Sequence, residues 1–123
     1  MLDEIAHAAV GALVAARRPP EETGEIVAAS VLIDLDHLPS ELGREWLRPA
    51  ARGRPYPHTA FTVLLALAAG RRPTALALAA HFGRDLTDAD SGVRLLWPLS
   101  LHEFFVPPPL YPMAIGALAS CGR

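Results

Sequence analysis

The chain has 123 residues and a net charge of −2, and hydrophobic residues make up 51% of it. This length suffices for one domain and is too short for two ordinary ones, so we expect a single domain over residues 1–123. The near-neutral charge argues against general nucleic-acid binding, which needs a basic face.

The N-terminal third of the chain predicts two helices separated by a pair of prolines. Asp3 can cap a first helix that runs to about Arg17, where Pro19-Pro20 must break it. Pro20 suits the first turn of a second helix, and the glutamates that follow favour the positive end of that helix. This second helix is expected to fade at Asp36-His37, before a proline.

The rest of the chain predicts shorter helices and an ordered loop, because prolines and glycines divide it into short apolar runs. In order, the predicted elements are a helix over Ser40–Trp46, an Arg- and Pro-rich loop over 48–57, a helix from Pro57 to Gly70, a helix from Pro73 or Thr74 to Thr87, an ordered loop over 88–100, a short turn at Leu101–Phe105 and a last apolar helix over Leu110–Ser120. No window alternates apolar and polar residues, so the sequence predicts an all-α, compact bundle of five to six short helices.

The location of the protein is also suggested by the sequence. The chain starts with acidic residues where a secretory signal would be basic, and its apolar runs are shorter than the ~18–20 residues of a spanning helix. The single cysteine, Cys121, fits a reducing compartment. We therefore expect a cytoplasmic protein, and peripheral contact with the inner face of the membrane stays open.

Histidines and aspartates fall on the core-facing stripes of the predicted helices. In the first helix, His7 shares a face with Val10, Gly11 and Val14. In the fifth, the spacing of three or four residues places the following set on one face: Thr74, Leu78, His81, Asp85 and Asp88. His81 and Asp85 are one turn apart, so their side chains can converge on one ion.

Two further segments carry such groups. Asp34-Leu35-Asp36-His37 concentrates three ligand types at the end of the second helix, and His58 is expected in the first turn of the fourth helix. At that position the helix dipole favours the neutral imidazole, which is the form that binds metal. Each feature alone has an ordinary explanation: a hydrogen-bonded core histidine, a surface ion pair, or a helix end followed by a turn.

The joint pattern predicts a metal site. Burying several ionisable groups costs several kcal/mol each unless something pairs them, and a cation would satisfy all of them together. Histidine nitrogens with carboxylate oxygens suit zinc first, and also manganese or iron. The predicted ligands of one or two such ions are His7, Asp36, His37, His58, His81 and Asp85, with Asp34 as a further ligand or partner.

These residues also resemble the YdjM family, which is described as inner-membrane-associated metal-dependent hydrolases. The resemblance rests on four segments in the family's order: Ala6-His7-Ala8, Ile33-Asp34-Leu35-Asp36-His37, Pro57-His58-Thr59, and His81-Phe82-Gly83-Arg84-Asp85 followed by Gly92 and Trp97-Pro98. Two positions differ from the family pattern. Ile33 stands where members have proline, and Arg52-Gly53-Arg54 lacks the histidine that often precedes this Arg-Gly pair.

The helical His/Asp set is also distantly similar to zinc phospholipase C and P1 nuclease. Together the resemblances imply a metal-dependent hydrolase of a phosphoester, with a small anionic or lipid-like substrate and a metal-activated water. Asp34 or Asp88 is expected to accept the proton of that water. Arg52 and Arg54 are expected to hold the substrate anion, although a solvated loop explains them equally well. The alternative is a non-enzymatic helical protein that uses the metal structurally or binds a partner.

Overall fold

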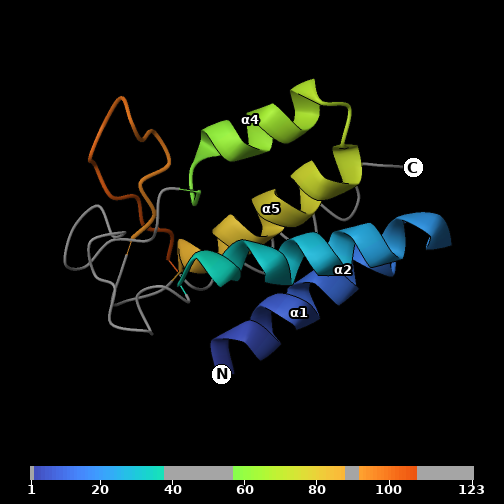
Figure 1. Ribbon diagram of the computed structural model, residues 1–123. Helices are drawn as coiled ribbons and strands as arrows, with labels where there is room; N and C mark the ends of the chain where they lie inside the picture. The colour runs from blue at the N-terminus through green and yellow to red at the C-terminus, as the bar shows by residue number, and fades with distance from the viewer. Residues whose placement is uncertain (1, 38–56, 88–91, 108–123) are drawn as a thin grey trace.

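The computed structural model describes residues 2–37, 57–87 and 92–107 of the chain (Figure 1). Within these ranges the protein is helical and contains no strand, so the all-α prediction is confirmed there. The elements are α1 (Leu2–Ala15), the 3-10 turn η1 (Pro20–Glu22), α2 (Thr23–Leu32), the 3-10 turn η2 (Ile33–His37), α4 (Ala60–Ala68) and α5 (Arg72–Asp85). The predicted helices over 40–46 and 110–120 lie outside the described residues, so the count of five to six stays a prediction.

Helix α5 lies at the centre of the arrangement, with α4 on one side and the α1–α2 pair on the other (Figure 1). Helices α1 and α2 run in opposite directions, and so do α4 and α5, because a short connection joins the helices of each pair. The end of α2, the beginning of α4 and the end of α5 lie at the same end of the bundle (Figure 1). Residues that are far apart in the sequence meet there.

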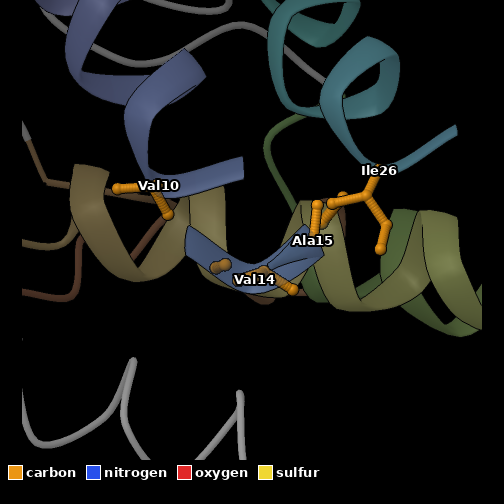
Figure 2. Close-up of a cluster of buried hydrophobic side chains, with 6 residues drawn as sticks. Val10, Val14, Ala15 and Ile26 are labelled. Atoms are coloured by element: carbon orange, nitrogen blue, oxygen red, sulfur yellow. The ribbon is translucent and has the colours of Figure 1, made fainter. Parts of the chain in front are cut away.

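The core is built from small and β-branched residues. Val10, Val14 and Ala15 of α1 pack with Ile26 of α2 (Figure 2), and two buried alanines of α5, Ala77 and Ala80, complete the cluster. Because alanine side chains are short, the helices approach closely, and the protein needs no bulky residue in this cluster.

Local chemistry explains where the helices begin and end. Pro20 starts a 3-10 turn rather than α2 itself, so α2 begins three residues later than predicted. Gly70 separates α4 from α5 with a φ of 72°, a conformation that glycine adopts without steric cost. The N-terminus of α5 is capped from a distance: the Glu25 carboxylate accepts hydrogen bonds from the Thr74 backbone N–H and from Arg71.

Residues 92–100, the described part of the loop predicted over 88–100, are non-helical as expected, but the predicted turn at Leu101–Phe105 is wrong. Phe104 instead forms an antiparallel bridge with Val93, and Arg94 pairs with Glu103 at 2.8 Å. The Val93 and Phe104 backbones exchange hydrogen bonds, so Phe104 is bonded across the loop rather than within a turn of its own segment.

Hydrogen bonds tie this loop to two helices. The Ala60 N–H at the start of α4 donates to the Leu95 carbonyl, and the Val106 N–H donates to the Leu86 carbonyl beyond α5. Both bonds lie close to the helix termini whose neighbouring residues form the cluster described next. In the part of the chain that the structure describes, no helix is long and apolar enough to cross a membrane.

Candidate metal centre

Five ionisable side chains from four segments converge at the shared end of the bundle. His7 comes from the first half of α1, Asp34 from η2, His58 from the residues just before α4, and His81 and Asp85 from the last turns of α5. We refer to these five residues as the His/Asp cluster. It contains two groups of three whose nitrogen or oxygen atoms lie within 4.8 Å of one another: His7, Asp34 and His81, and His58, His81 and Asp85.

One oxygen of each aspartate lies close to both Nε2 atoms of the His58–His81 pair. The Nε2 atoms of His58 and His81 are 3.3 Å apart. Asp34 Oδ1 is 3.4 Å from the first and 3.3 Å from the second. Asp85 Oδ2 is 3.5 Å and 3.3 Å from the same two nitrogens. Ligand atoms around a tetrahedral ion lie about 3.3–3.4 Å apart when the bonds are ~2.0–2.1 Å long, so His58, His81 and Asp85 have the spacing of three ligands of one ion.

The orientation of His81 is fixed by a backbone group. Its Nδ1 lies 2.8 Å from the buried carbonyl oxygen of Ser30, and because a carbonyl can only accept, Nδ1 must carry the proton. In the neutral ring the lone pair is then on Nε2, which faces the cluster. Ligating histidines commonly donate their other N–H to a carbonyl in this way.

His7 lies between the two carboxylates. Its Nδ1 is 2.8 Å from Asp34 Oδ2, and its Nε2 is 3.1 Å from Asp85 Oδ1. Each aspartate therefore directs one oxygen to His7 and the other to the His58–His81 pair. In a neutral ring His7 can offer one lone pair to an ion, and as an imidazolium it can donate one N–H hydrogen bond to each carboxylate.

Burial makes these contacts strong. The exposed side-chain fraction is 0–1% for the three histidines and for Asp85, and 14% for Asp34. Burial by itself lowers the pKa of His81, but the hydrogen bonds to Asp34 and Asp85 outweigh it and raise the pKa to about 9. The pKa of His7 is raised in the same way. Burial alone raises the pKa of Asp34, whereas its three histidine partners hold that pKa well below its ordinary value.

These buried His and Asp groups could hold a metal ion. No protein-family model, no curated protein and no solved structure matches this chain. The geometry and chemistry of the His/Asp cluster are therefore the basis for interpreting the site.

The structure brings together four of the six residues predicted as ligands, namely His7, His58, His81 and Asp85, which remain predicted ligands. Asp34, expected both as a further ligand or partner and as a proton acceptor, contacts all three of these histidines. The backbone of Asp36 and His37 lies in η2, but their side chains lie outside the described residues. The predicted proton acceptor Asp88 and the predicted anion-binding Arg52 and Arg54 also lie outside them.

One position differs from the prediction. His58 was expected inside the first helical turn, but α4 begins at Ala60 with Thr59 as its N-cap in an extended conformation. The residues before Thr59 form a turn, in which the Thr59 N–H donates to the Pro57 carbonyl. The imidazole is therefore placed by this turn rather than by the helix.

The sequence analysis did not predict that the Ser30 backbone carbonyl accepts a hydrogen bond from His81, because every residue type carries a backbone carbonyl. An indirect signal was present in Gly11 on the face of His7. A Cβ at Gly11 would lie 2.5 Å from Ser30 Oγ, so only glycine allows α1 to approach α2 this closely. The buried Ser30 hydroxyl donates to the Ile26 carbonyl one turn earlier, so it needs no partner outside its own helix.

A Gly11→Ala substitution should lower the free energy of unfolding by about 1–3 kcal/mol, because the new methyl group overpacks the α1–α2 contact. The same change at Gly24 in α2 meets nothing within 4 Å and should stabilise the protein by about 0.5 kcal/mol. Urea titration of both variants measures the difference. If the two variants were equally stable, the Ser30 side chain would have moved aside without cost. The close contact between α1 and α2 would then not be needed to position the His/Asp cluster.

Proposed function

We propose that the protein is a metal-dependent hydrolase of a phosphoester and that zinc is its metal. The observation that carries the proposal is the close approach of the His58 and His81 Nε2 atoms to Asp85 Oδ2, at 3.3–3.5 Å, with Asp34 Oδ1 at 3.3–3.4 Å from the same two nitrogens. Mixed nitrogen and carboxylate donors of this kind favour zinc, with manganese or iron as alternatives. The order of the His and Asp segments also supports membership of the YdjM family, which remains part of the proposal.

The cluster is best suited to one ion. Both groups of three contain His81, and its Nδ1 already donates to the Ser30 carbonyl, so only Nε2 is available as a ligand atom. A single imidazole lone pair binds one cation at a time. His7 then has the role of holding the outer oxygens of Asp34 and Asp85 in place, or of replacing one of the four ligands.

Solvent and substrate would reach the site from the side of Asp34, the most exposed of the five side chains. A divalent cation supplies Lewis-acid stabilisation of phosphoryl charge and lowers the pKa of water. Asp34 would then orient the attacking water with Oδ1, in the arrangement in which His7 replaces it as a ligand. The Arg52 and Arg54 guanidinium groups would neutralise the phosphate, and Asp88 is retained as the second candidate proton acceptor.

Hydrolysis of bis(p-nitrophenyl) phosphate by the zinc-loaded protein tests this proposal. Turnover should stop with a chelator, return with added zinc, and fall at least 100-fold in the Asp85→Asn variant, because the ion is then held weakly. An Arg52→Ala/Arg54→Ala double variant should keep one zinc per chain and lose turnover. p-Nitrophenyl acetate serves as the control substrate, since it lacks a phosphoryl group.

The burial of the cluster supports a second candidate function. Four of the five side chains are essentially inaccessible, and structural zinc sites are closed whereas catalytic sites keep an open position. The same experiment separates the two functions. One zinc per chain without turnover of any phosphoester would favour a non-enzymatic metal-binding protein and contradict the hydrolase proposal.

Peripheral contact with a membrane is a further part of the proposal, supported by α4. This helix contains no charged residue and none of its residues is buried, with exposed fractions of 57% at Leu64 and 70% at Leu65. Arg71 and Arg72 follow it directly, and basic residues at this position suit anionic headgroups. Flotation with anionic phospholipid vesicles tests this contact.

A further inference from the structure

A groove runs along one face of α5, and none of the residues that line it belongs to the His/Asp cluster. Its floor is formed by Ala75, Leu76 and Ala79, with Arg72 at its start. These residues are three, four and seven positions beyond Arg72, so they lie on one side of the helix. The groove volume is about 450 Å³, within the range of roughly 300–1,000 Å³ that is typical of small-molecule sites.

The walls of the groove are aliphatic. Val63 and Leu67 of α4 line it, and the alanines of α5 leave space at its floor because they carry only a methyl group. The lining contains no aromatic ring for a ring system to stack on, so an apolar chain suits it better. Leu67 is 49% exposed, so a bound chain would cover surface that now contacts water.

One end of the groove is positively charged. Arg72 is the first residue of α5 and is exposed, and Arg18 lines the groove from the segment after α1. Two described glutamates form ion pairs with arginines other than Arg72. Glu22 pairs with Arg18 at 2.9 Å, and Glu25 pairs with Arg71 at 3.1 Å. Arg72 is therefore the cation best placed to hold an anion at this end, next to the positive end of the helix dipole.

We propose that this groove binds a single-chain anionic amphiphile of the medium-chain fatty-acid type. The carboxylate contacts Arg72, and the alkyl chain follows the face of α5 as far as Ala79. This stretch of helix is about 10 Å long, which corresponds to roughly eight methylene groups. The site is independent of the proposed hydrolase activity, because it shares no residue with the His/Asp cluster.

Calorimetric titration of the intact protein with monomeric fatty acids of six to twelve carbons tests the inference. Affinity should rise roughly three- to fourfold per added methylene and then level off near eight to ten carbons, where the groove is filled. Arg72→Glu should weaken decanoate binding about tenfold or more, because an ionic contact is replaced by repulsion. Arg17→Glu is the matched control, since this exposed neighbour is not among the lining residues.

A second pair of variants tests the apolar part of the site. Ala79→Leu should fill the groove and shorten the preferred chain, whereas Ala28→Leu on the exposed side of α2 should leave binding unchanged. Circular dichroism verifies that both variants fold. The proposal is overturned if decyltrimethylammonium binds as tightly as decanoate, or if Arg72→Glu and Arg17→Glu behave alike. It is also overturned if only vesicles and no monomeric fatty acid bind.

Discussion

Zinc should stabilise this protein by about 4 kcal/mol when its free concentration is 1,000 times the dissociation constant. The reason is that the ligand atoms belong to segments that meet only in the folded chain, so an ion bound there has no equivalent site in the unfolded chain. Urea denaturation with zinc and with a chelator measures this difference. Elemental analysis gives the stoichiometry, for which we expect one ion per chain.

The Asp85→Asn substitution should remove most of this zinc-dependent stabilisation. Asp85 is fully buried and contacts all three histidines of the cluster, and an amide cannot replace the charge of its carboxylate. Glu21→Gln is the matched control, because it removes one exposed carboxylate on η1. If Asp85→Asn bound zinc as tightly as the unaltered protein, Asp85 would not be a ligand.

The metal-free protein should become less stable as the pH rises from about 6.5 to about 9. The folded state holds a proton on His81 up to a pKa of about 9, whereas the unfolded state releases it near the ordinary value of 6.5. The contribution of His81 is thus complete below pH 6.5 and is lost as the pH passes through 9. The shift corresponds to about 3 kcal/mol.

Zinc should reverse this trend, because metal and proton compete for the same imidazole nitrogen. The stabilisation by zinc should therefore be larger at pH 8.5 than at pH 6. Urea denaturation at four pH values, with and without zinc, provides the comparison. His102→Ala is the control, since this exposed histidine lies outside the cluster. A metal-free protein whose stability does not change over this pH range would contradict the protonated network.

Much of the fold could be predicted from the sequence because prolines and glycines mark the ends of its helices. Pro19-Pro20 and Gly70 mark the helix limits well, and the structure places the breaks there. The errors arose where tertiary contacts decide the conformation. The Leu101–Phe105 segment forms no turn because Phe104 is bonded to Val93, and no local signal predicts a pairing partner eleven residues away.

The site was foreseeable from helical spacing but not from any local motif. His7, His81 and Asp85 share stripes with buried apolar residues, so their burial followed from periodicity. The place where these side chains meet depends on the antiparallel order of the helices. This order brings together segments that are far apart in the sequence, and residue spacing within one helix cannot predict it. The contact of His81 with the Ser30 carbonyl required the structure, because any residue type could supply that oxygen.

The position of the two α5 groups relative to His7 affects how the chain folds. His81 and Asp85 are one helical turn apart, whereas roughly 80 residues separate His7 from Asp85, so an ion held on α5, with His7 bonded to Asp85 beside it, would tie α1 to α5 across a long stretch of chain. Binding of the ion to the last turns of α5 is local and fast, and recruitment of α1 closes the long loop. Refolding in zinc should therefore be limited by the docking of α1 and not by the capture of the ion.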